Sequence, residues 1–376
     1  MLSLETRRDL VERWRAEYGL ASKKDKGHVL DSLCEATGWN RKHAIAAIKE
    51  LPVVPPKRRR QRKRRYGVNE EAALVKVWKL SDYLASKRLA PFMEEFLEVL
   101  ERHEELKFGE PIRSRLAQMS ASTIDRLLKR HRHQRPKPMS STRPGALLKS
   151  QVAIRRGTGW DENRPGFCEV DTVAHNGGDC REGHFFTLSL TDICTGWTET
   201  APLRSKGQHE TRRQLQSIRA RLPFELLGID SDNGGEFMNW HLANFCLDKG
   251  IQFTRCRPYI KNDQCYIEQK NSSVVRKHTG YGRYETDRQF GLLAKIHGLL
   301  RLLVNFFEPS LKGKEKAMTP YRRLLAANLL TETQADVLKE TYLSLNPVSL
   351  RTELLKAKME LYELESLVSF LNDATV

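Results

Sequence analysis

The chain has 376 residues, of which 39% are hydrophobic and 30% charged, and this balance indicates a soluble globular protein of two or three domains. Its net charge of +17 favours a polyanionic partner, and double-stranded DNA is the partner we expect. Seven cysteines without a Cys-x-x-Cys pair argue against a disulfide framework and against a zinc site built from paired cysteines and histidines.

Residues 1–56 are predicted to form a helix-turn-helix module. The opening segment MLSLETRRDL contains no signal-peptide core, so we expect a cytoplasmic protein that is associated with the nucleoid when bound to DNA. Further on, the pattern predicts two short helices joined by a turn at Gly38, with Asn40 capping the second helix. Arg41 and Lys42 begin that helix and are candidate DNA contacts. The same pattern also fits a helical hairpin without a role in DNA binding.

Residues 57–66 are predicted to be a basic linker. The stretch KRRRQRKRR supplies eight positive charges after a proline-rich segment that ends the preceding helix. A solvated tail would have the same composition. In a chain that is basic elsewhere as well, we favour a tether that lies along DNA phosphates.

A second helical region is predicted over residues 67–135. Its last helix is expected to begin after Ser120, which can cap it, and the turn before it gives a second helix-turn-helix candidate. Candidate DNA contacts lie on the first turns of that helix, namely Ser122, Thr123 and Arg126. A linker rich in proline, serine and basic residues is expected over residues 136–162 and marks a domain boundary.

Residues 163–310 are predicted to form a mixed α/β domain. Three β-branched and aromatic runs separated by short turns indicate an antiparallel meander over residues 167–203. Alternating helices and strands then continue to about residue 278, so we expect a mixed five-stranded sheet with flanking helices. The most apolar helix, FGLLAKIHGLLRLLVNFF, is interrupted by Lys295, His297 and Arg301, which argues against a membrane span.

Three acidic residues stand out in this domain. Asp171 lies in the middle of the first predicted strand, Asp232 ends the fourth, and Glu268 lies in the helix after the fifth, with 35 residues between the last two. A buried carboxylate without a partner is costly, and clustered carboxylates generally need a cation or a proton. Their order and spacing resemble those of the retroviral-integrase-like insertion-sequence transposases, over roughly residues 163–285. The segments that carry the resemblance are EVDTVAHNGG, LTDICTGWTE, GIDSDNGGEF and TRCRPYIKNDQCYIEQKN.

The resemblance implies a ribonuclease-H-like catalytic core with an Asp–Asp–Glu triad of metal ligands at Asp171, Asp232 and Glu268. It implies a DNA transposase that binds transposon ends and catalyses strand cleavage and strand transfer with two Mg²⁺ ions, for which Mn²⁺ can substitute. Two such ions about 3.5–4 Å apart stabilise the attacking and leaving oxygens of a phosphodiester. Hard cations of this kind prefer oxygen ligands, which the three carboxylates supply.

Other side chains around the triad are candidates for supporting roles. Asp230 lies one alternation step before Asp232, so it either supports the metal site or faces solvent at the end of the strand. Glu236 is expected to begin the next helix. Candidate DNA contacts are Lys261 in the loop before the helix of Glu268, and Asn271, Arg276 and Lys277 along that helix. For the charged residues of this helix, a solvated surface is the alternative.

Residues 311–376 are predicted to be a C-terminal helical region. Its last helix carries an apolar stripe at Leu350, Leu354, Leu355, Met359, Leu361, Leu364 and Leu367. The stripe either docks on its own catalytic core or joins two chains, since a homodimer or larger assembly is expected on two DNA ends. Two other functions remain open: a metal-dependent nuclease of the same fold without strand transfer, and a non-catalytic helix-turn-helix regulator.

Overall fold

The computed structural model describes residues 4–49, 65–132, 163–179, 181–231, 236–237, 240–255, 265–313 and 315–373. They belong to two compact units, Met1–Arg65 and Tyr66–Val376. Most of the basic linker and the whole of the second linker therefore lie outside the described residues. Asp232 and Lys261 do so as well.

The first unit consists of three short helices. These are α1 (Leu4–Leu20), α2 (Asp25–Thr37) and α3 (Arg41–Ile48). Gly38 ends α2 with a φ of 70°, a conformation that suits glycine, and Asn40 caps α3 by accepting a hydrogen bond from the His43 amide at 2.9 Å. The predicted turn at Gly38 and cap at Asn40 are therefore present, whereas the helix-turn-helix assignment and DNA binding by this unit stay predictions. A small apolar core holds the helices together through Val11, Val29, Leu30, Leu33, Ala44 and Ile48.

The second unit begins with a bundle of four helices. These are α4 (Val68–Leu80), α5 (Ser86–Arg102), α6 (Glu110–Ala117) and α7 (Ala121–Leu128). Ser120 caps α7 by accepting from the Thr123 amide, as its sequence predicts. Two acidic residues at the start of α4 form ion pairs within the bundle. Glu70 pairs with Arg115 of α6, and Glu71 pairs with Arg130, which follows α7.

A five-stranded sheet follows, in the spatial order β3-β2-β1-β4-β5. The strands are β1 (Phe167–Ala174), β2 (Phe186–Asp192), β3 (Thr198–Leu203), β4 (Gly228–Ser231) and β5 (Gln252–Arg255). The first three pair antiparallel, and β4 and β5 join β1 in parallel. The predicted mixed five-stranded sheet is confirmed.

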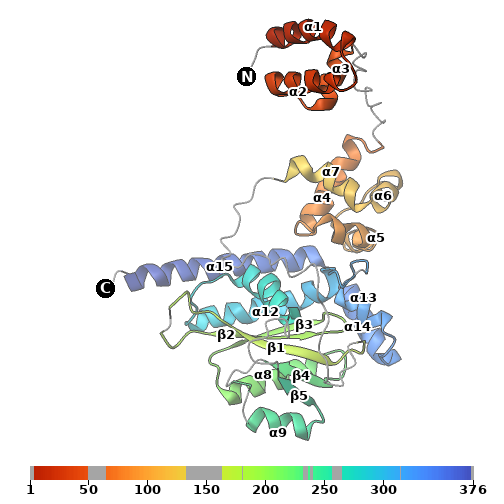
Figure 1. Cartoon of the computed structure of the whole chain (residues 1–376). Coiled ribbons are helices and arrows are strands. Elements are labelled where there is room, and N and C mark those ends of the chain that lie inside the picture. The colour runs from red at the N-terminus through yellow and green to blue at the C-terminus, as the bar shows by residue number, and fades with distance from the viewer. Residues whose placement is uncertain are drawn as a thin grey trace. The chain divides into compact units, whose positions relative to one another are not determined.

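Helices cover both faces of this sheet (Figure 1). On one face lie α8 (Gln208–Arg221) and α9 (Trp240–Asp248). On the other face lie α12 (Asp287–Phe307) and the long C-terminal α15 (Pro347–Asp373). Between β5 and α12 the chain forms α10 (Cys265–Lys270), a π-helical turn η3 (Asn271–Arg276) and α11 (Lys277–Thr279).

Helix α12 is the central helix of this unit. By length and composition it could cross a membrane, but 61% of its most apolar window is buried inside the fold. Its leucine and phenylalanine side chains pack into the apolar core shared by the sheet and the surrounding helices. The helix therefore has the burial expected of the core of a folded domain, in agreement with the sequence interpretation.

The C-terminal region is helical, as predicted. It contains α13 (Pro320–Ala326), α14 (Glu332–Ser344) and α15. These helices also hold the four-helix bundle: Glu95 of α5 accepts hydrogen bonds from Arg322 and from the Tyr342 hydroxyl, both at 2.9 Å. Asn346 donates to Glu105 at 2.6 Å at the start of α15. The bundle and the sheet consequently share one apolar core.

Three buried histidines lie on the α12 side of the sheet. The hydroxyl of Thr187 is 2.7 Å from Nε2 of His175 and 2.9 Å from Nε2 of His297. Burial lowers the pKa of His297 to about 3 and that of His278 to about 2, and holds the pKa of His175 well below its ordinary value. All three imidazoles are therefore neutral in the folded protein at neutral pH.

We predict that this unit loses stability as the pH falls below about 6.5, the ordinary pKa of histidine. Below that pH these histidines are protonated in the unfolded chain, whereas the buried imidazoles of the folded chain remain neutral. The free energy of unfolding therefore falls by up to about 1.4 kcal/mol per pH unit for each histidine. The loss continues until the folded pKa, about 3 for His297, is reached. Urea unfolding from pH 7.5 to 5 measures the slope.

The variant His297→Gln, which keeps a polar group near Thr187, should reduce that slope by the contribution of one histidine. His209→Gln, at an exposed position on α8, is the matched control for the change of residue type. Equal slopes for the wild-type chain and His297→Gln would contradict the assignment of a neutral, buried His297.

Candidate active site

Strand β1 carries two acidic residues on one face. Glu169 and Asp171 are two positions apart, so their side chains project to the same side of the sheet. Glu169 is fully buried, whereas Asp171 is partly exposed. His175 continues this face toward α12 through its contact with Thr187 and His297. The acidic face of β1 is therefore the face that α12 covers.

Helix α10 is fastened to this face by two hydrogen bonds. The backbone amide of Ile267 donates to Oε2 of Glu169 at 2.8 Å. Four residues further along, Nδ2 of Asn271 donates to Oδ2 of Asp171 at 2.6 Å. Glu268 lies between these two attachments and is exposed.

Both carboxylate oxygens of Asp171 accept hydrogen bonds. Oδ2 accepts from Asn271, and Oδ1 accepts from the backbone amide of Thr172 at 2.7 Å. These hydrogen bonds fix the orientation of the carboxylate. The arrangement therefore presents an oriented oxygen ligand at the partly exposed end of the acidic face.

Asn271 begins the π-helical turn η3 directly after α10. Isolated π turns occur frequently at functional sites because they displace one side chain from its regular helical position. Here Nδ2 of Asn271 points to Asp171, while its Oδ1 is buried without a hydrogen-bond partner among the described residues. The amide therefore serves Asp171, which is a role distinct from the DNA contact that the sequence suggested.

Asp230 is the neighbour of Glu169 across the parallel β1–β4 pair. It is only 5% exposed, and its Oδ1 accepts from the hydroxyl of Thr254 at 2.8 Å. The sequence left open whether Asp230 supports the metal site or faces solvent. The prediction that it faces solvent is therefore wrong. The residues Glu169 and Asp230 thus lie side by side on adjacent strands, two positions before Asp171 along β1. Ser231, the last described residue of β4, pairs in register with Val170 and immediately precedes Asp232 in the sequence.

Glu236 belongs to the opposite face of β1. It accepts a hydrogen bond from the hydroxyl of Thr172 at 2.8 Å and pairs with Lys206 at 2.7 Å. Although its partial burial alone would raise it, the pKa of Glu236 is lowered overall because Lys206 and Thr172 donate to the carboxylate. The sequence had suggested that Glu236 begins the next helix. In the structure it lies in a turn before α9. Alternation along β1 separates it from Asp171.

The basic residues after Glu268 make contacts within the fold. Arg276 is half-buried and donates to the carbonyl oxygens of Ala174 and Gly280 at 2.7 and 3.3 Å. Lys277 pairs with Asp82 of the four-helix bundle at 2.8 Å. The structure therefore gives both residues a structural partner, and their contact with DNA stays a prediction.

The candidate DNA contacts of the two helical modules lie on α3 and α7. Lys42 is exposed on α3, while Arg41 pairs with Asp31 of α2. On α7, Ser122 and Arg126 are exposed and Thr123 is partly exposed. All of them lie in the first turn of their helix except Arg126, which is in the last turn of α7. Binding by either set is untested.

The carboxylate oxygens at this site fit a hard divalent cation. Asp171 and Glu268 supply oxygen donors of the kind that Mg²⁺ binds, commonly with water and substrate phosphate completing the shell. Asp171 is already oriented by Asn271 and Thr172, as ligand carboxylates commonly are by their neighbours. Within the described ranges no three His, Cys, Asp or Glu side chains form a group that could hold a metal ion. The third predicted ligand, Asp232, is outside those ranges.

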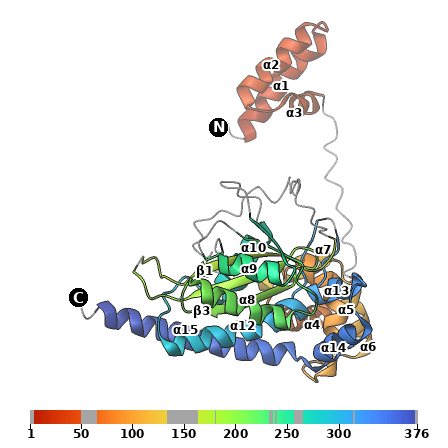
Figure 2. The ribbon, with the colours of Figure 1, turned by 90° about the horizontal axis from the view of Figure 1, so that it is seen from below.

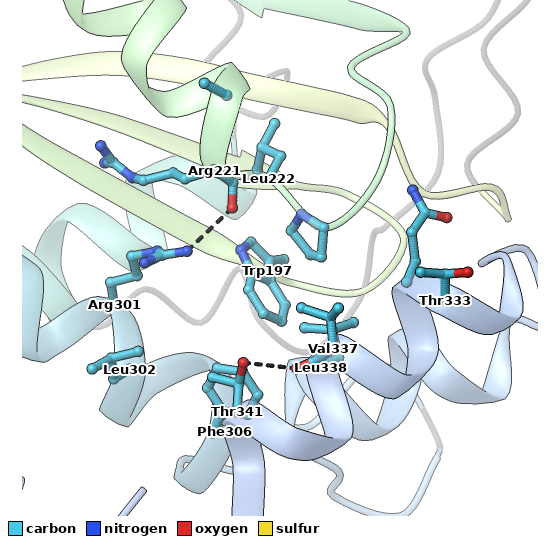
Figure 3. A pocket seen from close by; sticks show the side chains of 13 residues that line it. Trp197, Arg221, Leu222, Arg301, Leu302, Phe306, Thr333, Val337, Leu338 and Thr341 are labelled. Carbon is cyan, nitrogen blue, oxygen red and sulfur yellow. Dashed lines mark hydrogen bonds between the residues drawn. The ribbon is translucent and has the colours of Figure 1, made fainter. Parts of the chain in front are cut away.

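A separate pocket of about 400 Å³ lies at the β3 edge of the sheet, two strands away from β1 (Figure 3). Trp197 and Phe306 form part of its apolar wall. Arg221 and Arg301 line it too, and each donates through Nε to the fully buried Glu199, at 2.6 and 2.8 Å. The two arginines are therefore occupied in neutralising a buried carboxylate, which joins α8 and α12 to β3.

Comparison with known proteins gives one substantial relative. The chain is 38% identical over 321 residues to the uncharacterized protein y4rM of Sinorhizobium fredii, a match that covers 84% of this chain and 90% of that protein. No protein-family model matches the chain. Among solved structures, the catalytic core domain of BIV integrase is similar to 43% of this chain and to 95% of its own chain, with 16% sequence identity and a TM-score of 0.31.

We predict that Glu169 holds α10 through its acceptor oxygen. Glu169→Ala should lower the free energy of unfolding by about 1–3 kcal/mol, because it leaves the buried Ile267 amide without its acceptor. Glu169→Gln keeps an acceptor and should stay within about 1 kcal/mol of the wild type. Urea unfolding measures both. Glu225→Ala, at an exposed position before β4, is the control. A loss for Glu169→Ala no larger than that of the control would contradict the assignment.

Proposed function

The chain belongs to the same family as the uncharacterized protein y4rM, and we propose that it is a DNA transposase that cleaves and joins DNA strands by metal-dependent phosphoryl transfer. The observation that carries the proposal is the hydrogen bond from Asn271 to Asp171. It ties the helix of Glu268 to the strand of Asp171, although 100 residues separate the bonded pair in the sequence. Two of the three acids of the proposed triad thus lie on adjoining elements.

Asp232 is the third acid of the proposed triad. Val170 and Ser231 are partners in the parallel β1–β4 register, and Asp171 and Asp232 directly follow them in the sequence. Continuation of the register by one residue would set these two carboxylates side by side, with Glu268 approaching from α10. Three carboxylates from two adjacent strands and one helix would then converge at one edge of the acidic face.

The residues of this chain have distinct roles in the proposed reaction. Two Mg²⁺ ions held by the three carboxylates would supply the charge that stabilises the attacking and leaving oxygens of the phosphodiester. Asn271 and the Thr172 amide hold Asp171 in one orientation. Glu169 fixes the first turn of α10 and hence the approach of Glu268. No side chain need act as a nucleophile, because water would cut the strand and the freed 3′-hydroxyl would attack the target.

DNA binding is assigned to the helical modules and the basic linker. The exposed helix starts of α3 and α7 would contact the transposon ends. The linker tract of residues 57–65 would add affinity that is independent of sequence, through contacts with phosphates. The net charge of +17 supports a polyanionic partner for the chain as a whole. In this proposal the protein works in the cytoplasm, on nucleoid DNA.

We predict that Asp171→Asn, Asp232→Asn and Glu268→Gln each abolish nicking and strand transfer but leave DNA binding nearly unchanged. Each substitution removes one charged ligand with little change of shape. Nicking in Mg²⁺ and in Mn²⁺, on duplexes that carry the inverted repeats flanking the gene, measures the loss. Glu225→Gln, at an exposed position, should keep full activity. Near wild-type nicking by any one of the three variants would remove that residue from the triad.

The same assay distinguishes a transposase from a nuclease. A transposase joins the cut 3′ end to a second DNA, which produces a branched or integrated product, whereas a nuclease yields cut ends alone. The wild-type chain should give both nicked and joined products, and all three triad variants should lose both together. If the wild-type chain nicks DNA but gives no joined product under conditions that bring two ends together, strand transfer is contradicted.

We predict that the basic tract contributes sequence-independent affinity. Replacement of its six arginines by glutamine should reduce the salt dependence of binding to random duplex DNA, because fewer counterions are released. With about 0.9 counterions released per phosphate contact, the slope of log K against log salt should fall by up to about 5. Fluorescence anisotropy at several salt concentrations measures the slope. An unchanged slope would show that the tract does not lie on phosphates.

A further inference from the structure

Helix α15 has two apolar faces, one packed in the core and the other largely exposed. Leu354, Ala357 and Leu361 are buried, and they pack in the core that α12 shares with α15. The helix runs along α12, and its C-terminal end extends beyond the sheet (Figures 1 and 2). The intramolecular interpretation of the apolar stripe is therefore correct for this face.

The second face is exposed. Leu355 and Met359 are 58% and 54% exposed. Tyr362 is 36% exposed at the edge of the same face, where its hydroxyl donates to the carbonyl oxygen of His278 at 3.2 Å. Positions 355, 359 and 362 follow the spacing of four and three residues that forms one stripe along a helix. Single exposed leucines are common on protein surfaces, but an aligned set on a helix whose other side is already packed is not explained by the fold of one chain.

The polar residues at both ends of this stripe are suited to burial. Thr352 and Ser366 continue the spacing in either direction. Their hydroxyls donate to carbonyl oxygens of the same helix, those of Val348 at 2.9 Å and Tyr362 at 3.0 Å. A partner that covers these residues would therefore not leave their hydroxyl hydrogens without an acceptor. The stripe extends over about four helical turns, from residue 352 to residue 366.

Charges beside the stripe identify the partner. Lys356 and Glu363 are both exposed and lie seven residues apart on the same side of it. In an antiparallel pair of identical helices, Lys356 of each copy faces Glu363 of the other, which gives two opposite-charge contacts. A parallel pair would instead bring like charges to the same level. Acidic residues outnumber basic ones in α15, so DNA phosphates do not fit this face.

We propose that α15 joins two copies of this chain through an antiparallel contact of the stripe formed by Thr352, Leu355, Met359, Tyr362 and Ser366. In this arrangement Met359 of one copy packs near Tyr362 of the other, close to the two-fold axis. Leu355 packs over Ser366. The contact is isologous, since the same surface is used by both copies. It is smaller than a standard protein interface, and the net charge of +17 opposes it, so association at micromolar chain concentrations is expected.

The first test is sedimentation velocity of the full chain without DNA, at physiological ionic strength and over micromolar concentrations. The wild-type chain should show a monomer–dimer equilibrium, and Leu355→Glu should weaken it at least about tenfold. Leu343→Glu on α14 is the matched control, because Leu343 is exposed to a similar degree, 52% against 58%. Circular dichroism verifies that the variants are folded. A strictly monomeric wild-type chain would assign the stripe to a different protein and overturn the proposal.

The second test exchanges charges. Lys356→Glu and Glu363→Lys should each weaken self-association, because each replaces two attractive contacts by two repulsive ones. An equimolar mixture of the two variants should form a heterodimer, since every contact across the antiparallel pair is then attractive again. The double variant should also recover self-association. Self-association of both single variants at the wild-type strength, or no heterodimer in the mixture, would exclude the antiparallel contact.

Discussion

Two hydrogen bonds between β1 and the helix that follows β5 hold the candidate active site together. Glu169 accepts from the Ile267 amide, and Asp171 accepts from Asn271, across 98 and 100 residues of sequence respectively. They bracket Glu268, so the position of that carboxylate depends on the acidic face of β1. The site therefore exists only when the sheet has formed and α10 has docked. A carboxylate that is buried for this purpose must be fully bonded, because an unpaired one would cost several kcal/mol.

Buried polar groups have a similar role elsewhere in the unit. Glu199 binds Arg221, Arg301 and the indole of Trp197, and thereby joins β3 to α8 and α12. Thr187 links His175 of the loop after β1 to His297 of α12. Such contacts contribute little net stability compared with apolar packing, but they permit only one alignment of the elements. Precise alignment is what a site built from several elements requires.

The C-terminal helices connect the parts of the second unit. Contacts of Arg322, Tyr342 and Asn346 fasten the four-helix bundle to the helices beside the sheet. Lys277 of the segment after Glu268 also reaches the bundle, at Asp82. The bundle that carries α7 is therefore held in a fixed relation to the candidate active site within this unit. The outer face of α15 remains available for a contact between chains, which would bring two such units together.

Local patterns in the sequence were sufficient for the elements of the fold. Alternating β-branched residues, the caps Asn40 and Ser120, and the turn at Gly38 act within a few residues, so each could be read without the structure. The spacing of Asp171, Asp232 and Glu268 likewise allowed the site to be proposed. The roles of Glu169, Asn271 and Asp230 could not be predicted in this way. They depend on hydrogen bonds and burial between strands and helices that are far apart in the sequence. The two faces of α15 were distinguished for the same reason: the sequence shows which residues are apolar, and only packing against α12 decides which of them are covered.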